Sequence, residues 1–301
     1  MDYVLTTNAL CKSYGSFKAL DAVSMHVPKG AIYGFVGKNG AGKTTLICGL
    51  QNATSGGYTL YGRENTDRRI DKARRRMGAV VETPSIYLDM TAEDNLKQQY
   101  QILGLPSYEG LEDILRLVGL ENTGRKKARN FSLGMRQRLG IAVALCGDPD
   151  FLVLDEPVNG LDPQGIVEIR ELLLKLNREY QITVLISSHI LDELAKLATH
   201  YGFIDNGRII KEISAKELEA ACRKCIKVEV TSVATLARIL DRLGVEYKVL
   251  DDRRVDIYAK LNISQLTLAL AEENCELLSV QENDESLESY YMSLVGGGKH
   301  D

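Results

Sequence analysis

The stretch GKNGAGKTT at residues 37–45 restricts the possible folds of this chain more than any other segment. It fits the pattern G-x-x-x-x-G-K-[ST] and stands between two apolar runs, AIYGFV and LICGL. Glycines at these positions let backbone amides converge on phosphate oxygens, and the helix that follows offers its N-terminus to the negative charge. A purely structural turn needs neither the lysine nor the hydroxyl. The pattern therefore predicts a buried strand, a phosphate-binding loop and a helix, in that order.

The residue types in this loop predict binding of ATP together with Mg²⁺. Lys43 is expected to reach the β- and γ-phosphates, and the hydroxyl of Thr44 is expected to ligate Mg²⁺. The other nucleotide contacts predicted for the same loop are Gly37, Asn39, Gly40, Gly42 and Thr45.

A pair of acidic residues follows a second apolar run. In FLVLDEP, four apolar residues lead directly to Asp155 and Glu156. In a nucleotide-binding protein, an Asp at the end of such a strand holds Mg²⁺, directly or through water, and a neighbouring Glu can polarise the attacking water. The alternative is a solvated acidic turn, which leaves the preceding fully apolar strand unexplained. The pair predicts a site of hydrolysis.

Three apolar runs, AIYGFV, FLVL and ITVLIS, are short and rich in strand-forming residues. Such runs are typical of strands that are buried on both faces, as in a parallel sheet covered by helices. A polar region with helical character separates the first two runs at about residues 85–145, and Thr91-x-x-Asp94 within it predicts a capping box. These patterns together predict an α/β fold.

The sequence pattern changes at about residue 216. Segments with strand or helix periodicity follow in the order β-α-β-β-α-β: IKVEV, VATLARILDRL, VEYKVL, VDIYA, ISQLTLALAEE and ELLSV. We therefore expect residues 216–301 to form a separate small α+β domain, and residues 1–215 to form the nucleotide-binding domain.

The formal charge of −4 is unevenly distributed, because residues 216–301 contain 11 Lys and Arg against 16 Asp and Glu. Neither domain is basic enough to predict a nucleic-acid partner. The six cysteines are scattered, and the start MDYVLTTNAL has no basic or apolar export signal. No apolar run reaches the roughly 18–20 residues of a membrane-spanning helix. These features predict a cytoplasmic protein that contacts a membrane through a partner.

Further motifs complete the pattern of a known family. FSLGMRQRLGIAVAL lies between the loop and Asp155, Asn159-Gly160-Leu161-Asp162 follows, and Ser188-His189 ends the third apolar run. With Tyr14 upstream of the loop, residues 4–215 resemble the ATP-binding cassette (ABC) ATPases. The resemblance implies a mainly parallel sheet flanked by helices, with an antiparallel β part and a helical subdomain.

The resemblance to ABC ATPases implies that Glu156 of this chain is the general base. It also implies that His189 contacts the γ-phosphate and positions the water. The ring of Tyr14 would stack on adenine. These three roles are carried over from the resemblance.

The segment FSLGMRQRLGIAVAL corresponds to the signature sequence of ABC ATPases. These proteins work as head-to-tail dimers, in which each ATP lies between the phosphate loop of one subunit and the signature of the other. The resemblance implies that Ser132 and the amide of Gly134 touch the γ-phosphate across this interface, and that Asp162 couples the two sites. The usual signature is LSGGQ, whereas here Leu133 and Met135 occupy two of its positions. Because the serine and one glycine remain, we expect the phosphate contact to persist.

Glu82 in AVVETPSIY stands where ABC ATPases normally have Gln. A carboxylate can accept hydrogen bonds or ligate Mg²⁺ or its water, but it cannot donate as an amide does. Glu82 is therefore a candidate both for catalysis and for metal binding. A subgroup that resembles bacitracin-resistance and lantibiotic-immunity exporters commonly has this Glu and a similar signature. This implies export of, or immunity to, antimicrobial peptides, with exporters of ions or small drugs as an alternative.

The resemblance further implies an ATPase subunit that powers a separate transmembrane permease from the inner face of the cell membrane. The segment PSIYLDMTAEDNL would form much of the socket for a helix of that permease, and local packing inside the helical subdomain is the alternative role for it. A non-transport ABC ATPase is the alternative class. A translation factor would show two cassettes, and a DNA-repair ATPase would have a long coiled coil before the signature; the sequence has neither.

Overall fold

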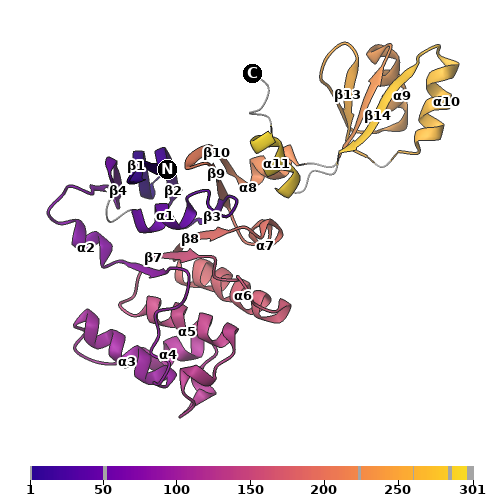
Figure 1. The fold of residues 1–301 in the computed structure, drawn as a ribbon. Helices are drawn as coiled ribbons and strands as arrows, with labels where there is room; N and C mark the ends of the chain where they lie inside the picture. Colours follow the sequence, from indigo (N-terminus) through magenta and orange to yellow (C-terminus); the bar gives the residue numbers. More distant parts are fainter. Residues whose placement is uncertain (1, 50–52, 223–224, 260, 284–286, 297–301) are drawn as a thin grey trace. The chain divides into compact units, whose positions relative to one another are not determined.

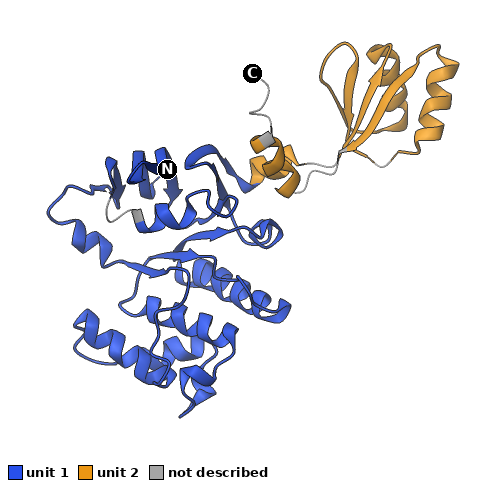
Figure 2. Cartoon of the chain, in the orientation of Figure 1, with its two compact units in different colours: residues 1–215 blue, residues 216–301 orange. Residues whose placement is uncertain are grey.

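The computed structural model describes residues 2–49, 53–222, 225–259, 261–283 and 287–296 (Figure 1). The chain divides into two compact units, residues 1–215 and residues 216–301 (Figure 2). Within the described residues, no helix has the length and hydropathy needed to cross a membrane.

Unit 1 contains two sheets. The antiparallel sheet has the order β2-β1-β4-β5 and consists of β1 (Tyr3–Tyr14), β2 (Phe17–Pro28), β4 (Ser55–Leu60) and β5 (Arg63–Glu64). The six-stranded sheet has the order β10-β9-β3-β8-β7-β6. Its strands are β3 (Ile32–Val36), β6 (Met77–Val80), β7 (Phe151–Asp155), β8 (Thr183–Ser188), β9 (His200–Asp205) and β10 (Arg208–Ser214). All neighbours in this sheet are parallel except β9 and β10.

Every residue of β3, β7 and β8 is buried, which confirms the expectation from their continuous apolar runs. One face of the sheet contributes Tyr33, Phe35 and Phe151 to a core shared with the antiparallel sheet and α1 (Lys43–Gly49). In Figure 1, α5 (Leu133–Leu145) and α6 (Pro163–Tyr180) lie on the other side of β7 and β8 from α1. The predicted α/β fold with an antiparallel β part is confirmed.

The predicted helical region contains α3 (Ala92–Leu103), α4 (Leu111–Leu117), two 3-10 turns (Glu121–Thr123 and Ala128–Asn130) and α5. The capping box at the start of α3 is confirmed. The Thr91 hydroxyl accepts a hydrogen bond from Asp94 N at 3.1 Å, and the Asp94 carboxylate accepts one from Thr91 N at 3.3 Å. Unit 1 also contains two short helices, α2 (Ile70–Arg74) and α7 (Leu191–Ala195). A third, α8 (Ala215–Ala221), begins at the last residue of unit 1 and continues into unit 2.

Unit 2 has the element order that the sequence predicts: β11 (Cys225–Val230), α9 (Val233–Leu243), β12 (Tyr247–Val249), β13 (Arg254–Ile257), α10 (Ile263–Glu272), β14 (Leu277–Asn283) and then α11 (Leu287–Gly296). Its antiparallel sheet has the order β12-β13-β11-β14. The strand β12 is shorter than the apolar run around it. Val245 is not part of this strand, because its N–H closes the end of α9 by donating to Leu240 O at 3.1 Å.

Candidate functional site

The carboxyl ends of four parallel strands meet at one edge of the six-stranded sheet. The phosphate loop follows β3, His189 follows β8, and the acidic pair lies at the end of β7. Glu82 follows β6 at the end of the same row. The register places Val36 beside Ser188 on the neighbouring strand. The motifs that the sequence separates by many residues are therefore adjacent in the fold.

The loop has a backbone that only glycine accommodates at two positions. A Cβ on Gly37 would lie 2.7 Å from Ile204 O, and one on Gly42, which has φ +108°, would lie 2.9 Å from Ala19 O. Among the described residues, the N–H groups of Asn39, Gly40 and Gly42 have no hydrogen-bond acceptor. Free backbone donors in a glycine loop before a helix fit the phosphates of ATP.

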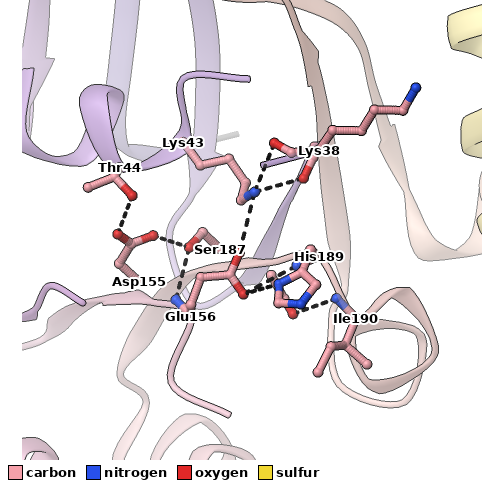
Figure 3. Close-up of polar contacts among 10 residues, drawn as sticks. Lys38, Lys43, Thr44, Asp155, Glu156, Ser187, His189 and Ile190 are labelled. Atoms are coloured by element: carbon pink, nitrogen blue, oxygen red, sulfur yellow. Dashed lines mark hydrogen bonds and ion pairs between the residues drawn. The ribbon is translucent and has the colours of Figure 1, made fainter. Parts of the chain in front are cut away.

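Lys43 is nearly fully buried, with 6% of its surface exposed. Its Nζ donates to Gly37 O at 2.7 Å and to Lys38 O at 3.2 Å, and it lies 3.3 Å from Glu156 Oε1 (Figure 3). The side chain of Lys38 itself points away from this cluster. The ammonium is thus held inside the loop by carbonyl groups and paired with one acidic residue.

Thr44 and Asp155 form the centre of the site. The hydroxyl of Thr44 donates to Asp155 Oδ2 at 2.6 Å, and the hydroxyl of Ser187 donates to Asp155 Oδ1. A hydroxyl and a carboxylate are the oxygen ligands that Mg²⁺ prefers, so these two residues fit that ion. In the described part of the chain, no cluster of three or more His, Cys, Asp or Glu residues could hold a metal.

Glu156 is oriented by His189. Its Oε2 lies 2.7 Å from His189 Nδ1 and accepts a hydrogen bond from His189 N at 3.3 Å. Its Oε1 is buried and accepts no hydrogen bond from any described residue, although Lys43 Nζ is close. Glu156 has φ +49°, a left-handed conformation that is uncommon for a residue with a side chain. His189 therefore holds Oε2, while Oε1 faces the ammonium of Lys43.

Glu82 also has a left-handed backbone, with φ +55°, and its side chain is exposed. It forms no hydrogen bond or ion pair with the described residues. Burial raises the pKa of the Cys48 thiol on α1, and the carboxylates of Asp155 and Glu82 raise it further. Glu82 therefore contributes to the electrostatic surroundings of Cys48.

The signature residues lie on another part of unit 1. Ser132 caps α5 by accepting from Met135 N at 3.2 Å, and Asp162 caps α6 by accepting from Gly165 N at 3.1 Å. A Cβ on Gly134 would lie 3.9 Å from both Leu161 and Gly165, so the two helix starts are neighbours. No hydrogen bond or ion pair between described residues joins them to the phosphate loop.

Two further sequence-predicted positions have open side chains. The ring of Tyr14, at the end of β1, is 57% exposed and has the ammonium of Lys12 at 5.3 Å from its centroid. The side chain of Thr45, in the first turn of α1, is partly buried. Neither residue contacts the acidic pair through a hydrogen bond of the described residues.

The sequence analysis missed Ser187, whose hydroxyl contacts both residues of the acidic pair. Its Oγ accepts from Glu156 N at 3.0 Å in addition to donating to Asp155. The one signal was the pair of serines directly before His189 at the end of an apolar strand.

A phosphate loop, an acidic pair and a histidine at one edge of a parallel sheet, with a signature helix on another part of the same unit, define a P-loop ATPase of the ABC type. Residues 20–159 match the family described as ABC transporter. The chain is 38% identical over 304 residues to a bacitracin transport ATP-binding protein of Bacillus licheniformis, with 99% of both chains covered. It is 43% identical over 212 residues to a lantibiotic transport ATP-binding protein of Streptococcus pyogenes, covering 69% of this chain and 90% of that protein.

A solved structure of an ABC transporter ATP-binding cassette in its ADP conformation is similar, with a TM-score of 0.66 and 28% identity. The match covers 74% of this chain and 95% of that one. The chain belongs to the ATP-binding proteins of ABC transporters. It is an ATPase subunit that binds and hydrolyses ATP.

Proposed function

We propose that this ATPase powers the export of antimicrobial peptides of the bacitracin or lantibiotic type, and so protects the cell that makes it. The observation that carries the proposal is the similarity to the bacitracin transport relative, which extends over 99% of this chain and therefore includes unit 2. Glu82, which is not the usual Gln, also supports this subgroup.

A susceptibility assay tests the substrate class. Cells that lack this protein but keep its membrane partner are complemented with the wild type or with Glu156→Gln, and growth is measured in bacitracin, in a lantibiotic and in an unrelated small drug. Protection against a peptide by the wild type alone supports the proposal. Protection against the small drug alone contradicts it and favours the alternative cargo of ions or small drugs. No protection against any of the three compounds also contradicts it.

We assign the nucleotide contacts to the phosphate loop. The amides of Asn39, Gly40 and Gly42 and the ammonium of Lys43 bind the phosphates, while Thr44 and Asp155 hold Mg²⁺. When bound, Mg²⁺ neutralises charge that develops on the β- and γ-phosphate oxygens. Tyr14 stacks on the adenine, for which its exposed ring is available.

We assign the general base to Glu156, which takes a proton from the attacking water at Oε1. The support is that Oε1 lacks a hydrogen bond from the described residues while Oε2 is held by His189. Lys43 lies 3.3 Å from Oε1, so the γ-phosphate would have to draw Lys43 away before the base can act. This exchange would link base activation to nucleotide binding. Glu82 is assigned to the water or to the metal at the edge of the site.

We further propose that the subunit acts as a dimer on a permease. Ser132 and Gly134 lie at an exposed or half-buried helix start and make no hydrogen bond to the phosphate loop of their own chain within the described residues, which suits a contact with the ATP of a second copy. Asp162, beside them, would couple the two sites. In this arrangement, residues 1–215 are the nucleotide-binding domain, with a helical subdomain at about 85–145. Residues 216–301 are an accessory domain that stabilises or regulates the dimer.

The permease and the expected position on the inner face of the cell membrane have a direct test. The tagged protein is extracted from native membranes in mild detergent, and the proteins that co-purify are identified. A multi-spanning membrane protein in near-stoichiometric yield supports the assignment, whereas ribosomes or nucleic acid in its place contradict it.

A further inference from the structure

We propose that Ser187 is a positioning residue that orients the metal ligand Asp155 through one hydroxyl and, more weakly, the base Glu156. The side chain of Ser187 is fully buried, and its Oγ donates to Asp155 Oδ1 while it accepts from Glu156 N at 3.0 Å (Figure 3). The inference rests on the proposed role of Asp155 in holding Mg²⁺ and extends it to a residue that does not touch the metal.

The geometry gives Ser187 control over the plane of the Asp155 carboxylate. The hydroxyl of Thr44 holds Oδ2 of Asp155 at 2.6 Å. Ser187 holds Oδ1 from the neighbouring strand β8, where it is the register partner of Asp155. With both oxygens held, the carboxylate cannot rotate about its terminal torsion, which otherwise has a broad range. Groups that hold a metal ligand in this way tune its affinity for the metal.

Burial makes this hydrogen bond consequential. Asp155 is only 1% exposed, so water does not readily replace a donor that is lost. Leaving one oxygen of a buried carboxylate without a hydrogen bond is costly. Without the Ser187 hydroxyl, the Asp155 carboxylate would therefore rotate toward another donor. Loss of the Ser187 hydroxyl should therefore misplace the ligand rather than unfold the sheet.

The second contact has a weaker consequence. The N–H of Glu156 donates both to Ser187 O at 3.1 Å and to Ser187 Oγ at 3.0 Å. The backbone bond survives when the hydroxyl is removed, so the left-handed turn at Glu156 keeps one of its two acceptors. We therefore expect the effect on metal binding to exceed the effect on Glu156.

The test measures metal binding without turnover. Binding of mant-AMPPNP, a fluorescent and slowly hydrolysed ATP analogue, is followed in the full chain as Mg²⁺ is titrated, and again in EDTA. For Ser187→Ala, the half-saturating Mg²⁺ concentration is expected to rise about 10- to 100-fold, with binding in EDTA unchanged. Ser187→Cys keeps the size and a weak donor, so its half-saturating Mg²⁺ concentration is expected to lie between those of the wild type and Ser187→Ala.

Ser188 provides a matched control on the same strand. It is 1% exposed, and its hydroxyl accepts from Ile190 N at 2.9 Å instead of contacting Asp155. Ser188→Ala removes an equally buried hydroxyl one residue away, and its Mg²⁺ midpoint should stay at the wild-type value. If Ser187→Ala fails to fold, Ser187→Cys carries the comparison.

Asp155→Asn distinguishes a failure of the proposed metal site from a failure of the role proposed for Ser187. A shifted midpoint for Asp155→Asn with a wild-type midpoint for Ser187→Ala or Ser187→Cys overturns the role of Ser187 and leaves the proposed metal site intact. Wild-type midpoints for both Asp155→Asn and Ser187→Ala overturn the metal site and the role of Ser187 together. An equal shift for Ser188→Ala and Ser187→Ala also overturns the proposal, because it indicates a general effect of the strand.

Discussion

Units 1 and 2 both cover sheets with helices, yet they place their charged residues differently. In unit 1, Lys43 and Asp155 are buried at the edge of a parallel sheet. In unit 2, the ion pairs that Glu273 forms with Arg238 and Arg242 join side chains of α9 to the end of α10, where both arginines are 67% exposed. Among the described residues of unit 2, Thr235 is the sole buried polar side chain.

This difference agrees with the proposed roles of the two units, a nucleotide site in unit 1 and an accessory domain in unit 2. Burying an ion is costly unless it is paired and hydrogen-bonded, so a fold that retains such groups without function would be less stable than it need be. The core of unit 2 is apolar and includes Val228, Leu240 and Leu270. The contrast predicts that substitutions in unit 1 affect catalysis, whereas substitutions in unit 2 affect stability.

The largest effect is expected for Glu156→Gln in unit 1. Removing the base while keeping the side-chain size should lower the rate of ATP hydrolysis about 10²- to 10⁴-fold, because that is the usual contribution of general base catalysis. Phosphate release measures the rate, and mant-AMPPNP measures nucleotide binding, which should persist. Glu179→Gln is the matched control, since Glu179 is exposed on α6 and the charge change is the same. Near-normal hydrolysis by Glu156→Gln would remove this residue from the role of base.

The next largest effect is expected for Leu240→Ala in unit 2. Leu240 is fully buried in the core of that unit, so the free energy of unfolding of unit 2 should fall by about 2–5 kcal/mol. Hydrogen exchange resolved by peptide measures the two units separately, and unit 1 should keep its protection. Leu243→Ala on the same helix is the control, because Leu243 is 56% exposed. Equal loss of protection in both units would show that they fold as one, and the comparison would fail.

A smaller effect is expected for Glu82→Gln at the rim of the site. Glu82 is exposed and unbonded among the described residues, so loss of its charge should raise the half-saturating Mg²⁺ concentration only about fivefold, which is about 1 kcal/mol. The mant-AMPPNP titration measures this shift. An effect as large as that of Asp155→Asn would instead make Glu82 a principal ligand.

The same substitution should change the reactivity of Cys48. The carboxylate of Glu82 contributes to the raised pKa of this thiol, so Glu82→Gln should lower that pKa. At a pH below the pKa, more thiolate is then present, and the thiolate is the reactive form. Peptide-resolved alkylation by iodoacetamide across a pH series should therefore show a curve for Cys48 that moves to lower pH. An unmoved curve would mean that Glu82 lies farther from α1 than its electrostatic effect indicates.

The smallest effect is expected for Arg242→Ala in unit 2. Its ion pair with Glu273 is exposed, and such pairs contribute about 0.2–1 kcal/mol. Urea unfolding at low and high salt measures the change, which should shrink as salt screens the wild-type pair. A loss above about 2 kcal/mol would show that unit 2, like unit 1, depends on its charged groups.

Much of the fold was predictable because its signals are local. The capping box at Thr91 and Asp94 spans a single helical turn, and the buried strands appear as continuous apolar runs. The loop at residues 37–45 carries its own chemistry in nine consecutive residues. The position of Ser187 was not predictable in this way, because its partner Asp155 lies 32 residues earlier in the chain.

Local sequence patterns were sufficient to predict the phosphate loop, the acidic pair, His189 and the element order of unit 2, because each depends on neighbouring residues or on a short period. The tertiary structure was needed to show that β8 lies between β3 and β7, that Lys43 pairs with Glu156, and that Ser187 holds Asp155. Strand order and register depend on the packing of whole faces against helices. No single segment contains that information.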